Sequence, residues 1–431
     1  MFLERDNFES VYSDIRLKIL TSGLNAVDVF FILTGFLLAY PIFTGKRTGS
    51  WTKFVWLRVS RVYPVYIASL VFFCGILQWG GTLPYLTWDK HPSLGLREVI
   101  RSVHNVDTDG VPHNCALAPF NLLFLNNLVP FGGCMGWTWS LCVQVAFYMI
   151  FPLVIRVFGT GRRLAYFMGA STLVMVLQRY LLYSRVMLQY GTPDLYLFSA
   201  DSLEQFFMFF NVWYSSTPQR IGVIFAGVAV AWAHVYAPQV ADTLRRSRLY
   251  STCFVLSLLP GLVISFYSDF ASVWHNVLFS VGGLIWLYSI SGAMFALINA
   301  VGPFAPLQRV LAHPLLGWLA VPTYPVYLMH SIVTVRLMAA GWIQPIYPFS
   351  WSALAHSCAM VLLVSYAYGV AVHNLVERPV KSWLRNRSLP APASADDDLK
   401  VAQLSNIQSR EKVNNPAPSL QAEESILTKR K

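Results

Sequence analysis

Charged residues are scarce in this 431-residue chain, and their scarcity excludes a soluble protein. Only 12% of the residues are Asp, Glu, Lys or Arg, whereas 55% are hydrophobic; soluble domains carry about a quarter charged residues. The apolar residues are gathered in runs of about 20, the length that crosses roughly 30 Å of hydrocarbon as a helix. The sequence therefore predicts an all-α polytopic membrane protein whose first partner is the lipid bilayer.

Several functional signals are also missing. The first 24 residues lack a basic segment followed by an apolar one, so we do not expect them to be a signal peptide. We find no internal repeat and no inverted pair of broken half-helices, which argues against a conventional transporter. The six cysteines include no CxxC pair, so no metal site is expected. The net charge of +11 lies mostly in short loops and the tail, which disfavours a nucleic-acid partner.

Nine membrane-spanning helices are expected from the apolar runs, with ends uncertain by several residues. They cover about residues 25–43, 62–80, 138–158, 164–183, 219–237, 249–268, 273–299, 315–337 and 352–375. The chain then divides into an external segment, residues 1–24, a transmembrane domain, residues 25–384, and a tail, residues 385–431. The tail is rich in Ser, Pro, Ala and Asp, so we expect it to be disordered.

The loops predict the orientation. Lys and Arg concentrate after the first, third, fifth, seventh and ninth predicted helices, as at Lys46, Arg47, Arg162 and Arg163. Because cytosolic loops carry the excess of basic residues, we expect the C-terminus in the cytosol and the N-terminus in the lumen or outside the cell. The membrane would be that of the endoplasmic reticulum or the plasma membrane.

Two cysteines lie in the one long loop, about residues 81–137, that this orientation places outside the cytosol. Cys115 and Cys134 would there meet an oxidising compartment, in which disulfides form. We expect a disulfide between them, which would stabilise the loop by about 3 kcal/mol in the chain-entropy picture. Two free thiols are the alternative.

The chain is organised around residues 133–153, GCMGWTWSLCVQVAFYMIFPL. Trp137 and Trp139 suit a headgroup interface, where an amphipathic ring keeps one edge wet. Gln144 places an amide inside the apolar run, where a polar group needs a partner. An ordinary membrane helix with an aromatic belt is the alternative.

Four stretches together resemble the membrane acyltransferase-3 family, in its nose-resistant-to-fluoxetine-like branch. They are VDVFFILTGFL at 27–37, LRVSRVYPVY at 57–66, CMGWTWSLCVQVAFYMIFP at 134–152 and YPVYLMH at 324–330. PQRIG at 218–222, ERP at 377–379, and Asn126 and Asn127 between the two loop cysteines fit the same branch. The resemblance covers about residues 25–384.

The resemblance implies transfer of an acyl group, from acyl-CoA on the cytosolic side, to a hydroxyl acceptor on the outer side. The acceptor would be a glycan or a lipid, and no bound cofactor is implied. Substrate-binding positions carried over from the motifs are Arg58, Arg61, Tyr66, Trp137, Trp139, Tyr148 and Tyr327. The two arginines would attract the phosphates of the donor, and ordinary positive-inside anchoring is their alternative role.

The catalytic candidates are His330, Gln144 and Asp28. His330 would act as a base or make a structural hydrogen bond to a neighbouring helix. Asp28 would orient an Arg or His on the family helix that this chain lacks, or mark a helix start at the interface. Gln144 replaces the acid of the family pattern, so it can hold a hydroxyl but cannot be a base.

The chain also departs from the family at its beginning. No helix with an Arg, and about ten residues later the presumed His base, precedes residue 25, and we expect an incomplete gene model. Together with Gln144, this departure gives an alternative function. The chain would then be a catalytically impaired family member that binds or transports a lipid or small molecule.

Overall fold

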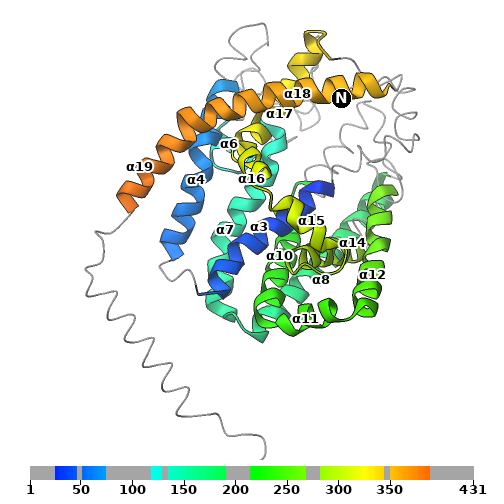
Figure 1. Ribbon diagram of the computed structural model, residues 1–431. Helices are drawn as coiled ribbons and strands as arrows, with labels where there is room; N and C mark the ends of the chain where they lie inside the picture. Colours follow the sequence, from blue (N-terminus) through cyan, green and yellow to red (C-terminus); the bar gives the residue numbers. More distant parts are fainter. Residues whose placement is uncertain are drawn as a thin grey trace, which may run out of the picture. The chain divides into compact units, whose positions relative to one another are not determined.

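The computed structural model describes residues 25–45, 51–73, 118–128, 134–190, 214–267, 282–343 and 350–388, and within these ranges it contains helices and no strand (Figure 1). This confirms the prediction of an all-α protein. The chain divides into two units, Met1–Glu377 and Arg378–Lys431. The first unit carries all the predicted site residues.

Each of the nine predicted apolar runs overlaps one long helix of the first unit. These helices are α3 (Ala26–Phe43), α4 (Trp51–Val71), α7 (Trp139–Phe158), α8 (Arg162–Tyr190), α10 (Thr217–Tyr236), α12 (Arg248–Tyr267), α14 (Gly282–Ile298), α17 (Thr323–Ala339) and α18 (Trp351–Val372). The shorter elements are α6 (Ala118–Leu122), η5 (Asn126–Leu128), η7 (Gly136–Thr138), α11 (Pro238–Arg246), α15 (Phe304–Leu311), α16 (Pro314–Ala320), the π-helical turn η9 (His373–Glu377) and, in the second unit, α19 (Arg378–Ser388).

Two of the predicted boundaries are wrong. Helix α4 begins at Trp51 rather than near residue 62, because basic side chains lower the hydropathy of its first turns without interrupting its backbone hydrogen bonds. The run predicted at 315–337 is broken between α16 and α17. Pro322 lies at the break; it has no N–H to continue the first helix, but it is suited to the start of the second.

The described helices fit a protein that crosses the membrane several times. Five of them are long and apolar enough to span it, namely Ala26–Phe43, Phe54–Val71, Gly136–Phe158, Thr217–Tyr236 and Trp351–Trp383. A sixth span results if α11 and α12, which meet at a bend of 109°, are counted together. The number of nine crossings therefore stays a prediction.

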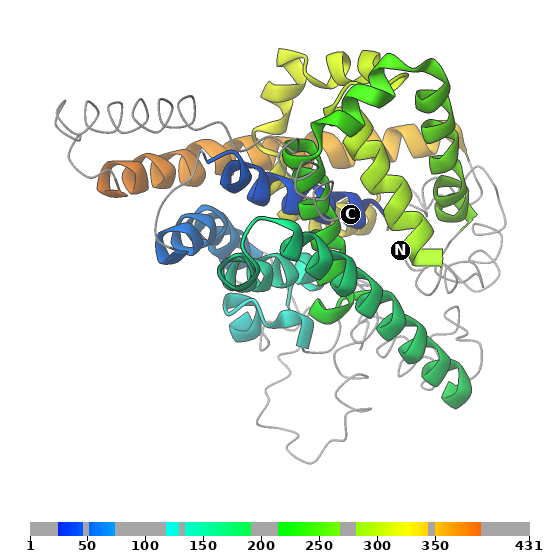
Figure 2. The ribbon, with the colours of Figure 1, turned by 90° about the horizontal axis from the view of Figure 1, so that it is seen from below.

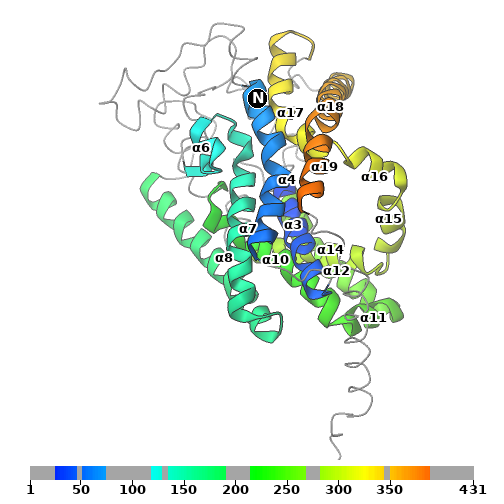
Figure 3. The same cartoon turned by 90° about the vertical axis from the view of Figure 1, so that its left-hand side faces the viewer.

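Helix α10 is the centre of the first unit, because it packs along α3, α8, α14 and α7. Helix α17 packs on α18 and on α4, and the two groups can be followed in the views from below and from the side (Figures 2 and 3). No residue of α15 or α16 is buried, and Figure 3 shows this helix pair at the edge of the unit.

Small residues allow α3 and α10 to touch backbone to backbone. A Cβ atom added to Gly35 would lie 2.0 Å from the carbonyl oxygen of Ile224, and one added to Gly227 would lie 1.9 Å from that of Ile32. Close contact of this kind is how helices associate where lipid removes the hydrophobic driving force between them. The α3–α10 pair is therefore fixed in register by two glycines.

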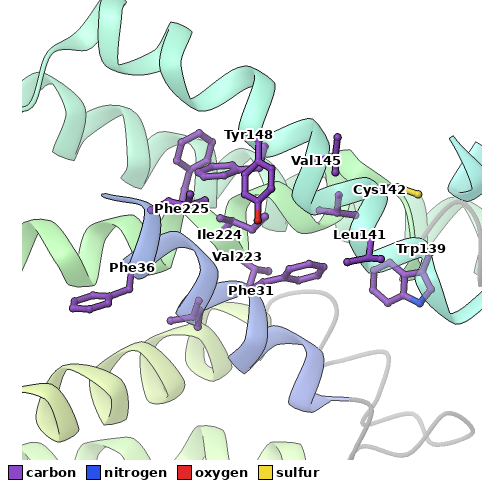
Figure 4. Packing of buried hydrophobic residues seen from close by; sticks show 14 of the residues in the cluster. Phe31, Phe36, Trp139, Leu141, Cys142, Val145, Tyr148, Val223, Ile224 and Phe225 are labelled. Carbon is purple, nitrogen blue, oxygen red and sulfur yellow. The ribbon is translucent and has the colours of Figure 1, made fainter. Parts of the chain in front are cut away.

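Aromatic side chains fill the space between this pair and α7 (Figure 4). Phe147 of α7 meets Phe225 of α10 edge to face at 5.3 Å between ring centroids. Phe31 of α3 meets Trp139 at the start of α7 at 6.0 Å. Such offset pairs add to the area that the rings bury, and they hold α7 against the α3–α10 pair.

We expect Gly227→Ala to lower the stability of the protein by about 1–3 kcal/mol, because the added methyl group overlaps the backbone of α3. Thermal unfolding in detergent, followed by tryptophan fluorescence, measures the effect. The control is Gly169→Ala on α8, where an added Cβ meets nothing within 4 Å. Equal losses in the two variants would contradict close packing of α3 on α10.

Candidate functional site

The start of α7 joins several elements through four consecutive side chains, Trp137, Thr138, Trp139 and Ser140. The turn that presents them closes when the backbone N–H and the hydroxyl of Thr138 both donate to the carbonyl oxygen of Met135, at 3.0 and 2.6 Å. Satisfying the local backbone in this way leaves the other side chains free to reach different neighbours.

Thr138 is the centre of a buried polar network. Its oxygen accepts the hydroxyl of Tyr66 at 3.2 Å and the amide of Asn126 at 3.3 Å. Asn121 donates to the hydroxyl of Tyr66 at 3.2 Å, and Cys142 donates to the Asn126 side chain at 2.6 Å. Buried polar groups satisfied in this way rigidify a site. The network ties α4 to the start of α7.

Tyr327 of α17 is bound to the same turn. Its hydroxyl donates to the carbonyl oxygen of Trp137 at 2.7 Å, so Ser140 donates to it, also at 2.7 Å. In return, the indole N–H of Trp137 donates to the carbonyl oxygen of Leu328 at 3.0 Å. These reciprocal bonds hold α17 on α7 next to His330.

His330 is half-buried, and its ring bonds within its own helix. Nδ1 lies 2.6 Å from the carbonyl oxygen of Tyr327, which can only accept, so Nδ1 carries a proton. In the neutral ring the lone pair is then on Nε2, 3.1 Å from the hydroxyl of Ser331. Within the described part of the chain, the ring therefore hydrogen-bonds to Tyr327 and Ser331 of α17 itself, and not to a neighbouring helix as in the structural alternative given above.

Asp28 forms a buried ion pair with Arg220, across α3 and α10. Its Oδ1 lies 2.5 Å from Nη1 of Arg220, and the two side chains are 2% and 1% exposed. Its Oδ2 accepts the indole N–H of Trp286 on α14 at 3.0 Å. Asp28 thus orients an arginine that belongs to α10; its orientation of an Arg or His on the missing family helix stays a prediction.

Arg220 is enclosed by aromatic rings. Its guanidinium carbon lies 4.5 Å from the ring centroid of Tyr214 and 5.4 Å from that of Trp139, and its Nε donates to the carbonyl oxygen of Tyr214 at 2.7 Å. Beside it, the buried Arg179 donates to the carbonyl oxygen of Gln219. Cation–π contacts are strongest when desolvated, so Trp139 faces this ion pair rather than a headgroup interface.

A polar stripe runs along α7 from this turn. Ser140, Gln144 and Tyr148 follow at intervals of four residues, so they share one face and extend over about 12 Å. The Gln144 amide donates to the hydroxyl of Thr34 on α3, at 3.5 Å, and Figure 4 shows Tyr148 on the side of α7 that faces α3. Gln144 therefore has a protein partner, as a polar group within an apolar run requires.

Two arginines of α4 approach the far end of the stripe. Arg58 and Arg61 lie close enough to Tyr148 for their charges to act on its hydroxyl. Arg58 also lies over the ring of Phe54, 5.8 Å from its centroid. The stripe thus begins at the Tyr327–His330 cluster and ends near two positive charges.

The structure brings most of the predicted site residues into two clusters joined by α7. Tyr66, Trp137, Tyr327 and His330 gather around one side of the turn, and Asp28 with Trp139 forms the ion-pair cluster on the other. Several partners were not predicted from the sequence, namely Thr34, Asn121, Ser140, Tyr214 and Trp286. Arg220 lies in the PQRIG stretch that fits the family pattern, but its partner lies 192 residues away in the chain.

The loop cysteines are only partly described. Cys134 is buried, and its backbone N–H donates to the side chain of Asn121 at 2.9 Å. Cys115 lies outside the described residues, so a disulfide with Cys134 stays a prediction. Among the residues that the structure describes, no group of three His, Cys, Asp or Glu side chains is placed to hold a metal ion.

We expect Asp28→Asn to destabilise the protein by about 3–5 kcal/mol, because it leaves the charge of Arg220 buried without its counterion. The matched control is Asp242→Asn, which breaks the exposed pair with Arg245 on α11 and should change stability by less than about 1 kcal/mol. Denaturation in mixed micelles measures both. An Asp28→Asn variant as stable as the control would contradict the role of the ion pair.

Comparison with known proteins assigns this chain to a family. A family model described as an acyltransferase domain, that of the acyltransferase-3 family, matches residues 3–370. The chain is 23% identical over 400 residues to nose resistant to fluoxetine protein 6 of Caenorhabditis elegans, covering 84% of this chain and 45% of that protein. The chain thus spans less than half the length of this curated relative, and no solved structure matches it. On this evidence, the chain belongs to the membrane acyltransferase-3 family, as a relative of its nose-resistant-to-fluoxetine branch.

Proposed function

We propose that this protein is an integral membrane acyltransferase, which moves an acyl group from acyl-CoA to a hydroxyl acceptor such as a glycan or a lipid. Family membership supports the class of reaction. The observation that carries the proposal is the polar stripe Ser140–Gln144–Tyr148, because it runs through an apolar bundle from a cluster of hydroxyls and a histidine to two arginines.

The arginine end of the stripe suits the donor. Arg58 and Arg61 would bind the phosphate groups of acyl-CoA, since arginine binds phosphate in a well-defined bidentate geometry. The thioester would then extend along the stripe.

The histidine end suits the acceptor. Transfer requires that the acceptor oxygen bonds to the acyl carbon, that the C–S bond breaks, and that the hydroxyl proton ends on the CoA sulfur. The Tyr327 carbonyl holds the proton of His330 on Nδ1, which leaves Nε2 in the form that a general base needs. Ser140 and Tyr327 would orient the acceptor hydroxyl. Asp28, with both oxygens bound, would act by positioning Arg220 and Trp139.

The proposed topology follows the basic loops. Nine crossings place the beginning of α4 and the end of α7 on the cytosolic side, together with the C-terminus, and leave residues 1–24 outside. The donor would enter from the cytosol, and the acceptor would come from the lumen or the cell exterior. The proposed disulfide between Cys115 and Cys134 would lie on that outer side, where it can form.

A binding or transport protein is the second candidate, and Gln144 favours it. The amide occupies the centre of the stripe and donates to Thr34, whereas the family pattern has an acid at this position. An amide cannot take up a proton as a carboxylate does. The side chains of the stripe would then bind an acylated ligand without reaction.

Release of free CoA tests the proposal. The purified full-length chain in nanodiscs is expected to cleave acyl-CoA faster than empty nanodiscs do. His330→Gln should lower kcat by about a hundredfold or more, the contribution of a general base, and Arg58→Gln should mainly raise KM. The control is Arg309→Gln, which changes an exposed arginine on α15 and should leave both constants unchanged.

The outcomes separate the two candidates. Binding of acyl-CoA without release of CoA, together with release gained by Gln144→Glu, would support the binding protein. Cleavage that survives in His330→Gln would remove the histidine from the reaction but leave the acyltransferase. If the protein neither binds nor cleaves acyl-CoA, both proposed functions are contradicted.

A further inference from the structure

A groove of about 520 Å³ lies between α4 and α7. Trp51, Trp56 and Val59 line it from α4, and Met149, Leu153 and Arg156 line it from α7. Its walls are open to the surroundings, since Trp56 is 62% and Leu153 is 61% exposed. The volume is within the range of small-ligand sites, and the medium that it faces in this protein is lipid.

The groove is polar at one end and apolar along the rest. Arg156 lies in the last turn of α7 and Thr52 in the first turn of α4, so both are at the same end. From Arg156 to Met149 the walls extend about 10 Å along the helix, roughly a third of the hydrocarbon thickness. A charge at the surface followed by an apolar trough matches a headgroup followed by an acyl chain.

The charge at the polar end is of one sign. No Asp or Glu occurs between residues 29 and 88 or between residues 110 and 193, so neither wall nor its neighbouring chain carries a negative charge. Arg162 and Arg163, which begin α8 just after the groove, are exposed. The groove therefore favours an anionic headgroup over a zwitterionic or cationic one.

The groove is separate from the donor end of the stripe. Arg58 and Arg61 do not line it, because they project from another face of α4, and Arg58 approaches Tyr148 instead. Basic pockets between membrane helices bind anionic lipid headgroups through the same phosphate chemistry. A ligand in the groove would leave the proposed donor site accessible.

We propose that this groove is a binding site for an anionic phospholipid of the cytosolic leaflet, with its phosphate on Arg156 and one acyl chain between α4 and α7. The lipid would hold the cytosolic ends of these two helices at the separation that the structure shows. The proposal rests on the groove and its charge, and it holds whether or not the protein transfers acyl groups.

Native mass spectrometry of the full-length protein tests the site. The detergent-purified protein is mixed with equal amounts of dioleoyl phosphatidylserine and dioleoyl phosphatidylcholine. The wild-type protein is expected to retain phosphatidylserine preferentially. Arg156→Gln should lower the retention of phosphatidylserine about fivefold, because it removes the attraction that one basic residue exerts on an anionic lipid at the surface. Leu153→Trp, which fills the apolar part with another apolar side chain, should lower retention of both lipids.

Arg163→Gln is the matched control, because this arginine is exposed on the same side but does not line the groove. The Arg163→Gln variant should retain phosphatidylserine to the same extent as the wild-type protein. Equal retention of the two lipids, or equal losses in Arg156→Gln and Arg163→Gln, would show ordinary annular lipid and overturn the proposal. Displacement of the bound lipid by palmitoyl-CoA would also overturn it, since the groove would then belong to the acyl donor.

Discussion

The buried ion pair between Asp28 and Arg220 is the constraint on which the arrangement of the helices depends. Lipid cannot solvate either charge, so each must find its partners within the bundle. Satisfying this pair brings together α3, α10, α14 and the start of α7, because Trp286 and Trp139 complete the surroundings of the two charges. The glycine contacts between α3 and α10 permit the short distance that the pair requires. Polar chemistry and close packing thus specify the same geometry.

The contacts that hold the start of α7 also determine the position of its polar stripe. Thr138, Ser140 and Trp137 connect it to α4 and α17, so the polar stripe runs at a defined position through the unit. The proposed function makes this stripe, which joins a histidine to two arginines, part of a route across the membrane. In the acyltransferase proposal, the acyl group and the acceptor meet along this route. In the further proposal, the groove between α4 and α7 takes a different ligand, an anionic phospholipid.

The sequence predicts the helices better than it predicts their partners. Apolar runs locate the long helices because a span must be apolar over its whole length, but basic residues concealed the first turns of α4, and the break at Pro322 was not predicted. The family motifs identified Asp28, Gln144 and His330 as candidates. They did not identify Arg220, Trp286 or Thr34 as contacts, because these depend on packing between distant segments. Trp139 was predicted at a headgroup interface and instead covers a buried charge, since a single residue type suits both environments.

Transfer of an acyl group across the membrane can be tested by following the sides on which the donor is consumed and the product forms. In sealed inside-out vesicles that contain the full-length protein, labelled acyl-CoA is added to the exposed cytosolic face. We expect label to accumulate on hydroxyl-bearing molecules enclosed within the vesicles, while CoA remains outside. Acylated product confined to the outer face, or label that stays on CoA although the protein binds it, would show that the protein does not transfer acyl groups across the membrane.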